Sequence, residues 1–148
     1  MSKTLPFAVT HHVRDNCLCL HAQRAARALA RHYDQALRPV GLTSGQFSLL
    51  MALNRPQPAG LGQVAPLLAM DRTTLTANLK PLKRDGLVEL RTSDADRRAR
   101  LLLLTPAGRT RLAEALPIWQ RVHARLEGLL GATAPDSVRA ALNVLASA

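Results

Sequence analysis

Apolar residues recur at helical spacing near the start of the chain and form one stripe. The stripe consists of Leu18, Ala22, Ala25, Leu29 and Ala36. Arginines occupy a different face of the same segment, which is typical of an amphipathic helix. Pro39 and Gly41 are poor continuations of a helix. The pattern therefore predicts a first helix from about Arg14 to Arg38.

Three shorter helices are predicted in the middle of the chain. Thr43 is a good N-cap residue for the first of them, and its inward face carries Phe47, Leu50 and Leu53. The second covers about Gly62 to Met70. Asp71 is the expected N-cap of the third, and Gly86 is its stop signal. The inward stripe of this third helix, at i, i+4 and i+7, is Leu75, Leu79 and Leu82.

A pair of strands and two further helices complete the pattern. The segment "LVELRT" (87–92) alternates apolar and polar residues, and "ARLLLL" (99–104) is a second strand candidate. A charged segment joins them, so we expect a β-hairpin with a charged tip. Thr105 and Pro106 are favourable first residues for a long helix that ends near Leu130. A last helix covers roughly Asp136 to Ala146.

This order of elements is that of a winged helix-turn-helix. We therefore expect a mainly α fold with a small β-hairpin wing (α+β), in a single domain over residues 1–148. The winged helix-turn-helix lobe covers about 43–104. Amphipathic helices flank it at about 10–40 and 106–148 and have no obvious partner within the chain. We expect them to pack together and to form a homodimer with a second subunit.

The distribution of charge along the chain indicates the kind of partner that the protein binds. The chain has 148 residues, a net charge of +10 and a pI near 11.4. Residues 72–111 hold ten of the twenty Lys and Arg side chains and four of the ten acids, so they carry +6 of the +10. A generally basic surface would not concentrate charge in this way. The distribution favours a polyanionic partner, with nucleic acid as the first candidate.

The helix after Asp71 turns small and cationic side chains away from its leucines. The residues expected to contact DNA from it are Arg72, Thr73, Thr74, Thr76, Ala77, Lys80, Lys83 and Arg84. Threonine is a mediocre helix former, so three threonines in one turn gain little on a merely solvated face, which is the alternative. Their small size permits close approach to a groove, and the cations suit phosphates. We therefore predict a recognition helix.

The hairpin tip adds Asp96, Arg97, Arg98 and Arg100 to the predicted contacts. On an extended segment, residues two apart point the same way, which places Asp96 beside Arg98. A bidentate pair would then orient the guanidinium for a narrow minor groove. Arg97 and Arg100 are expected to contact phosphates or to remain spare surface. A catalytic pair of Asp94 and Asp96 would need a pocket, which a hairpin tip does not offer, so we expect no enzyme.

Three segments resemble the MarR family of bacterial transcription regulators. They are "LTSGQFSLLMAL", "MDRTTLTANLKPLKRDGLVE" and "DADRRARLLLLTPAGR", and the likeness covers most of the chain. The resemblance implies an obligate homodimer on a pseudo-palindromic operator of double-stranded DNA, usually a repressor relieved by a small molecule or an oxidant. It matches Thr73, Thr74 and Thr76 to the helix that enters the major groove. It matches Asp96 and Arg98 to the wing's Asp-x-Arg element.

The chain departs from the family pattern at three positions. Ser93 and Ala95 stand where the wing often carries an Asp and an Arg, so the wing is reduced. Ala77 stands where the recognition helix often carries an Arg. It removes a bidentate guanine contact that would be worth about 1–3 kcal/mol of discrimination. The operator would then be read more by its shape, or by thymine methyl groups near Ala77.

Cys17, Cys19 and His21 are candidate sensing residues at the start of the first helix. On one continuous helix the two thiols would point about 200° apart, which prevents a disulfide. Some family members, notably the OhrR type, sense peroxides through an N-terminal cysteine. Burial of two small residues in a dimer interface is the interpretation we favour, and a metal site begun by Cys17 and His21 ranks third. An aromatic carboxylate effector between the dimerisation helices and the DNA-binding lobe is a further expectation from the resemblance.

The remaining expectations are absences. The chain shows no nucleophile, metal or phosphate-loop motif, and we expect no cofactor and no metal. It shows no signal peptide and no stretch that crosses a bilayer, so a cytoplasmic protein without a membrane partner is expected. The rival function is a non-specific basic DNA-coating protein without a regulatory ligand. It would share the charge but would lack a large preference for one DNA sequence.

Overall fold

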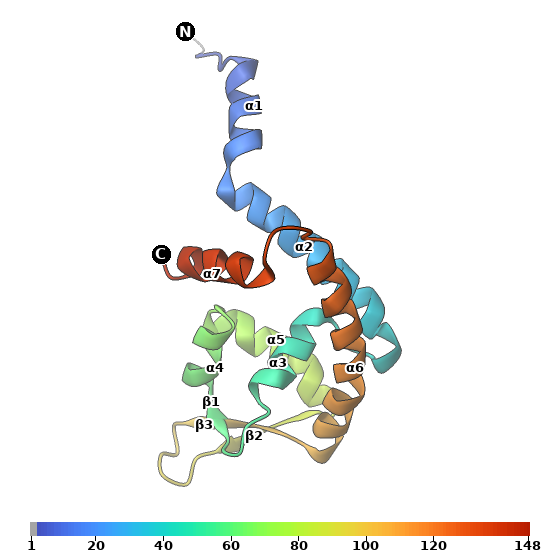
Figure 1. The fold of residues 1–148 in the computed structure, drawn as a ribbon. Helices are drawn as coiled ribbons and strands as arrows, with labels where there is room; N and C mark the ends of the chain where they lie inside the picture. Colours follow the sequence, from blue (N-terminus) through green and yellow to red (C-terminus); the bar gives the residue numbers. More distant parts are fainter. Residues whose placement is uncertain (1–2) are drawn as a thin grey trace.

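The computed structural model describes residues 3–148 (Figure 1). Its helices are α1 (Phe7–Asn16), α2 (Leu18–Leu37), α3 (Ser44–Ala52), α4 (Leu61–Leu67), α5 (Arg72–Arg84), α6 (Pro106–Gly128) and α7 (Pro135–Ala146), with a 3-10 turn over Arg38–Val40. Its strands are β1 (Ala59–Gly60), β2 (Val88–Thr92) and β3 (Arg100–Leu104). A mainly helical chain with a small antiparallel sheet confirms the predicted fold class.

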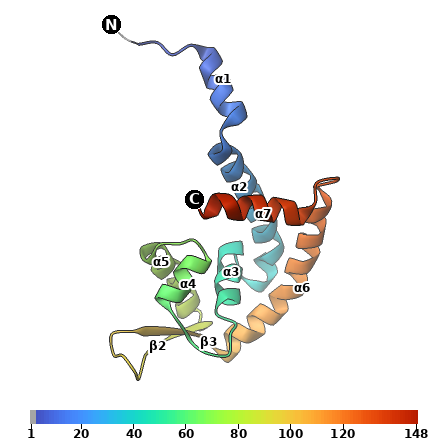
Figure 2. The same cartoon turned by 60° about the vertical axis from the view of Figure 1, so that its left-hand side comes forward.

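Two long helices support a compact lobe. α2 and α6 pack side by side, and α3, α4, α5 and the three strands gather beside them (Figure 1). In both ribbon views α1 extends away from the rest of the chain, and α7 turns back from the end of α6 and runs above the lobe (Figure 2). The lobe therefore lies between a long helix that precedes it in the chain and another that follows it.

The three strands form one antiparallel sheet in the order β1-β3-β2. β2 and β3 pair over all five residues of each strand, which confirms the predicted hairpin. The sequence did not predict β1, because two residues inside "RPQPAG" show no alternation. β1 pairs Ala59 with Leu102. It thereby ties the loop after α3 to the wing.

The single helix predicted over Arg14–Arg38 is wrong at its start. The chain forms two helices separated at Cys17, whose backbone is extended, with φ −70° and ψ 111°. The Asn16 side chain donates to the His12 carbonyl oxygen at 2.7 Å, a local bond that competes with continuation of the helix. The Cys17 Sγ accepts from the Leu20 N–H at 3.5 Å and begins α2. Apolar periodicity did not reveal this break because it occupies one residue.

A capping box begins α3 at the predicted Thr43. The Thr43 Oγ1 accepts from the Gln46 N–H at 3.2 Å, and the Gln46 Oε1 accepts from the Thr43 N–H at 3.0 Å. Asp34 of α2 adds a second cap, because its carboxylate accepts from the Ser44 N–H at 2.7 Å. This bond joins the first helix of the lobe directly to the long helix before it.

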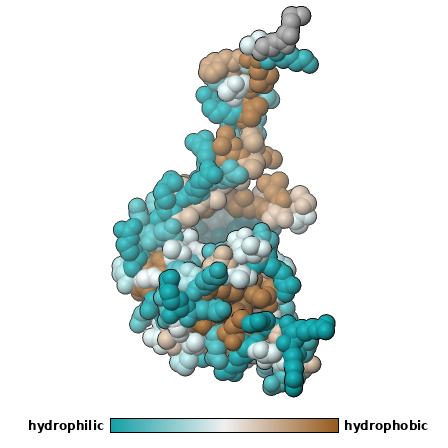
Figure 3. Space-filling model, turned by 180° about the vertical axis from the view of Figure 1, so that it is seen from behind, coloured by the Kyte–Doolittle hydropathy of each residue, from teal (hydrophilic) through white to brown (hydrophobic). Residues whose placement is uncertain are grey.

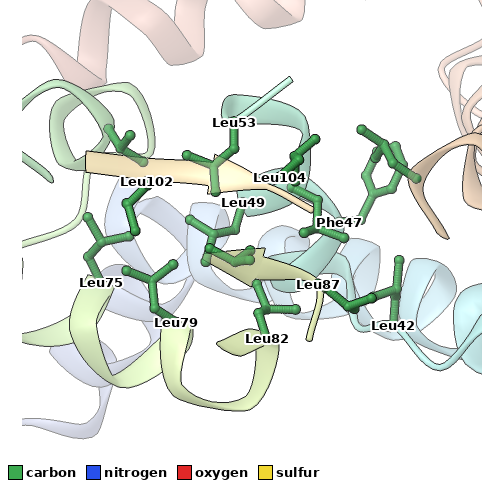
Figure 4. Packing of buried hydrophobic residues seen from close by; sticks show 14 of the residues in the cluster. Leu42, Phe47, Leu49, Leu53, Leu75, Leu79, Leu82, Leu87, Leu102 and Leu104 are labelled. Atoms are coloured by element: carbon green, nitrogen blue, oxygen red, sulfur yellow. The ribbon is translucent and has the colours of Figure 1, made fainter. Parts of the chain in front are cut away.

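A leucine-rich core fills the space between α3, α5 and the sheet (Figure 4). The predicted stripe of α5 lies in this core, because Leu75, Leu79 and Leu82 are 0%, 3% and 1% exposed. The predicted inward face of α3 is also buried, and it consists of Phe47, Leu50 and Leu53. The leucine spacing therefore identified the buried face of α5. The opposite face of the helix is exposed to solvent.

One threonine joins the end of α5 to the start of α6. The Thr105 Oγ1 donates to the Gly86 carbonyl oxygen at 2.6 Å, and the Thr105 N–H donates to the Leu87 carbonyl oxygen at 3.1 Å. The same hydroxyl accepts from the Gly108 N–H at 3.0 Å and caps α6, as predicted. A Cβ at Gly108 would lie closer than 3.0 Å to the Leu87 carbonyl oxygen. The two backbones therefore approach closely enough to require glycine at this position.

The terminal helices α1 and α7 bury no residue within the described chain. Their exposed large apolar side chains are Phe7, Val9, Val13, Leu142, Val144 and Leu145. Seen from behind, hydrophobic side chains gather on these end helices, whereas the tip of the hairpin is hydrophilic (Figure 3). Exposed apolar surface of this extent is typical of an interaction surface.

We predict that Gly108→Ala lowers the free energy of unfolding by about 1–3 kcal/mol, because the added methyl group must push α6 away from Leu87. Gly128→Ala is the matched control, since it lies in the same helix and its Cβ would meet nothing within 4 Å. The control should be neutral or stabilising by up to about 1 kcal/mol. Urea unfolding followed by circular dichroism measures both, and an unchanged midpoint for Gly108→Ala would contradict the close approach.

Candidate nucleic-acid interface

Asp71 caps the start of α5, as the sequence predicted. The Asp71 Oδ1 accepts a hydrogen bond from the Thr74 N–H at 2.7 Å. It thereby satisfies one of the N–H groups that have no partner within the first turn of a helix. The same backbone bond is the main cause of the lowered pKa of Asp71. The carboxylate therefore stays ionised at neutral pH and holds the first turn of α5.

The outward face of α5 forms a shallow recess away from its buried leucines. The recess is lined by Arg72, Thr73, Thr76, Ala77 and Lys80. Thr74, Lys83 and Arg84 are exposed on the same helix. All eight residues predicted on α5 are therefore accessible to a partner, and five of them line one surface. The Thr76 hydroxyl donates to the Arg72 carbonyl oxygen at 2.8 Å.

Asn78 is an exposed polar residue of α5 that was not among the predicted contacts. Its amide donates to the Thr74 carbonyl oxygen at 3.0 Å and to the Met70 Sδ at 3.8 Å. These bonds join the first turn of α5 to the loop before it. A helical wheel centred on Leu75 places Asn78 at the edge of the buried stripe, which is the signal that could have identified it.

The predicted pairing of the Asp96 carboxylate with the Arg98 guanidinium at the wing tip is wrong. Residues 93–99 form a loop, not an extended strand. The Asp96 Oδ1 accepts from the Arg98 N–H at 3.0 Å, so it holds the main chain and not the guanidinium. The Ser93 Oγ accepts from the Ala95 N–H at 3.3 Å and from the Asp96 N–H at 3.4 Å. A short side chain in a turn bonds more easily to neighbouring N–H groups than to the guanidinium at the end of a flexible arginine.

Arginines dominate the surface of the wing. Arg97, Arg98 and Arg100 are exposed, and within residues 3–148 none of them forms an ion pair with an acid. Arg91 differs, because its Nε lies 2.8 Å from the Glu89 Oε1. The hydrogen bond from Arg91 lowers the pKa of Glu89. Three wing arginines are therefore available to an anionic partner, and Arg91 is partly neutralised.

The candidate sensing residues lie at the break between α1 and α2. Cys17 is half-buried at the junction, and Cys19 is exposed on α2. The premise that one continuous helix holds both thiols apart is therefore wrong. The His21 Nδ1 lies 2.7 Å from the Cys17 carbonyl oxygen, so the ring contacts the main chain. Across residues 3–148 no three His, Cys, Asp or Glu side chains are grouped as metal ligands.

An apolar groove of about 360 Å³ lies between α3 and α6. It is lined by Phe47, Ser48, Met51, Leu116 and Trp119. The Trp119 ring stacks on Phe47 with centroids 6.1 Å apart, and on His123 at 4.4 Å. An effector site was expected between these two parts, but none of the residues that line this groove was predicted, although a lone Trp in a chain with 3% aromatics was a signal. Because α3 belongs to the lobe and α6 leads away from it, the groove lies where the two parts meet.

The ion pair between Glu127 and Arg139 links α6 to α7. The Glu127 Oε1 lies 2.6 Å from the His123 Nε2 and 2.9 Å from the Arg139 Nη1. Arg139 also pairs with Asp136 at the start of α7. The pKa of Tyr33 on the neighbouring α2 is raised, mainly because the phenol is partly buried and also because Glu127 is negatively charged. Because these ion pairs are partly solvated and α7 buries no residue, they hold α7 only weakly within one chain.

Three short helices, a hairpin wing and an exposed cationic face on the last of the helices define a winged helix-turn-helix protein. The MarR family pattern matches residues 40–99, and solved regulators that are 37% and 30% identical cover 89% and 98% of the chain. The chain belongs to the MarR family of transcription regulators. Within residues 3–148, no helix has the length and apolar character needed to cross a membrane.

Two relatives have been solved with DNA. The Mycobacterium tuberculosis transcriptional regulator MosR in complex with DNA is 37% identical, with a TM-score of 0.82 over 89% of this chain and 95% of that chain. The transcriptional repressor CouR bound to a 23-mer DNA duplex is 30% identical, with a TM-score of 0.76 over 98% of each chain. The fold is therefore similar to that of DNA-bound regulators along most of its length.

A curated relative matches over a shorter part. The transcriptional activatory protein BadR of Rhodopseudomonas palustris is 34% identical over 97 residues, which are 64% of this chain and 55% of that protein. The matched part thus spans about half the length of that relative. Its name describes an activator, whereas CouR is a repressor, so relatives of this chain act in both directions.

We predict that Asp71 makes part of the stability dependent on pH. Because its pKa is lowered in the folded chain, its stabilising effect is present at neutral pH and is lost as the pH falls below about 4. Asparagine caps helices as well as aspartate does and does not titrate. Between neutral pH and about pH 3, the thermal midpoint of Asp71→Asn should therefore fall less than that of the native chain. Equal falls in both proteins would contradict the lowered pKa.

Proposed function

We propose that this protein is a sequence-specific, double-stranded DNA-binding transcriptional regulator. The observation that carries the proposal is the outward face of α5, where small side chains lie between Arg72 and Lys80. The major groove of B-DNA admits one helix, and small residues let the helix approach the base edges. Cations at both ends of the face suit the phosphates beside the groove. The DNA complexes of MosR and CouR support the same assignment.

The proposal gives each part of the interface a role. In the major groove, the residues expected near base edges are Thr73, Thr74, Thr76 and Ala77. The cations expected near phosphates or in the adjacent minor groove are Arg72, Lys80, Lys83, Arg84, Arg97, Arg98 and Arg100. Asp96 is expected to act through the loop backbone that it holds, because its carboxylate accepts from an N–H and not from the Arg98 guanidinium.

We also propose that the protein acts as a homodimer on a pseudo-palindromic operator. Residues of about 43–104 would form the DNA-binding lobe, and about 10–40 and 106–148 the dimerisation helices. The exposed apolar side chains of α1 and α7 support this, since a second subunit would cover them. A twofold axis would place two α5 helices about 34 Å apart, which is one turn of B-DNA.

We propose repression that an aromatic effector relieves, with the groove between α3 and α6 as its site. The lining of Phe47, Met51 and Trp119 suits an aromatic ring. A ligand there would shift the angle between the lobe and α6 only if it binds one arrangement better than the other. An oxidant that acts on Cys17 is the second candidate signal, because the Cys17 Sγ caps the start of α2.

We predict that a salt titration separates the regulator from a non-specific coating protein. Both should bind DNA with a steep dependence on salt, because cations displace counterions from phosphates. The regulator should prefer its operator over a scrambled duplex by about a thousand-fold or more. The operator is obtained by footprinting on the DNA upstream of the protein's own gene. A ratio near one at every salt concentration would contradict the proposed function.

The effector prediction uses the single tryptophan. A phenolic acid in the groove should change the emission of Trp119 and weaken operator binding over the same concentration range, because Trp119 lines the groove. An oxidant signal should instead release DNA after hydroperoxide treatment, with loss of free thiol and no saturable change in emission. Unchanged DNA affinity in both arms would contradict relief by either class of signal.

A further inference from the structure

The centre of the α5 recess presents methyl groups, although its sequence is rich in hydroxyls. The Thr76 hydroxyl donates to the Arg72 carbonyl oxygen at 2.8 Å, one turn back along the same helix. With its oxygen committed to the main chain, exposed Thr76 offers its Cγ2 methyl group to the outside. Ala77 follows it and offers only a Cβ methyl group. Thr76 and Ala77 therefore each contribute a methyl group to the lining of the recess.

The surroundings of these methyl groups place them opposite base edges. Arg72 and Lys80 stand one turn before and one turn after Thr76, at the two ends of the recess. If these cations contact phosphates, the residues between them face the floor of the groove. On the same helix the Asn78 amide donates to the Thr74 carbonyl oxygen at 3.0 Å, and the Asp71 carboxylate accepts from the Thr74 N–H at 2.7 Å. Between the two cations the recess is lined by Thr73, Thr76 and Ala77, which are not the bidentate donors that identify guanine or adenine.

We propose that the recess identifies thymine through its C5-methyl group, which would pack against the Thr76 Cγ2 and the Ala77 Cβ. This inference rests on the proposed DNA-binding function and specifies what α5 recognises. In the major groove the thymine methyl group is the apolar feature that distinguishes one base from the other three. Recognition of DNA shape, which needs no contact at these residues, is the alternative that the experiment must separate.

The test begins with selection of bound duplexes from a random library, which gives the operator half-site. We expect a thymine at the position that faces the centre of α5 in each half-site. Deoxyuridine in place of that thymine removes only the methyl group and keeps the pairing edge. Affinity should fall by about four-fold for one half-site and about fifteen-fold for both, as expected for one lost methyl contact in each. In duplexes with cytosine at this position, 5-methylcytosine should bind more tightly than cytosine.

Two variants of Thr76 assign the contact. Thr76→Ser keeps the hydroxyl and removes Cγ2, so its affinity ratio between thymine and deoxyuridine should fall clearly below the native value, with only the Ala77 Cβ left to contact the methyl group. Thr76→Val keeps the carbon and removes the hydroxyl, so its ratio should stay near four for one half-site. Thr110→Ser, on the exposed surface of α6, is the matched control for loss of a threonine methyl group and should keep the native ratio. Comparison of ratios isolates the coupling of one protein group to one DNA group.

Each outcome decides between the interpretations. A selected operator without thymine at the central position overturns the inference, and so does a native ratio near one with an otherwise selective protein. Dependence on the methyl group that survives in Thr76→Ser and is lost in Thr76→Val assigns the contact to the hydroxyl and also overturns it. Failure to enrich any sequence contradicts the proposed function itself, so the two failures are distinguishable.

Discussion

The pairing of Thr105 with the carbonyl groups of Gly86 and Leu87 is the constraint on which the rest of the lobe depends. It joins the end of α5, the start of β2, the end of β3 and the start of α6 at one point. The buried Gly108 lets α6 lie directly against the Leu87 backbone. The start of α6 is thereby held at one point to the end of α5 and to both strands of the wing.

Short polar side chains in the interface mostly organise the backbone. Asp71 holds the first turn of α5, Ser93 and Asp96 hold the wing loop, and Thr76 bonds to its own helix. In each case an N–H or carbonyl group is the nearest partner, and a local bond costs less side-chain entropy than one to a distant cation. The long side chains of Arg72, Lys80, Arg97, Arg98 and Arg100 form no ion pair among the described residues and are accessible to an anionic partner.

Much of the fold could be predicted because it depends on local rules. The spacing of Leu75, Leu79 and Leu82 identified the buried face of α5, and Thr43, Asp71 and Thr105 each begin a helix where a capping residue was recognised. The errors involve competition between local bonds. The Asn16 side chain bonds to the turn before Cys17, where a continuous helix was predicted. The Asp96 carboxylate accepts from the backbone N–H of Arg98, where a bond to the Arg98 guanidinium was predicted. Periodicity carries no information about such choices.

The sequence by itself determined the order of the predicted elements, the buried stripes of α3 and α5 and the concentration of positive charge in residues 72–111. These follow from residue type and spacing, whereas the family was indicated by the resemblance of three segments. The tertiary structure decided what lies far apart in sequence: the pairing of Ala59 with Leu102, the Asp34 bond to α3, and the groove in which Trp119 of α6 meets Phe47 of α3. Packing creates such contacts, because they depend on how helices meet and not on any single segment.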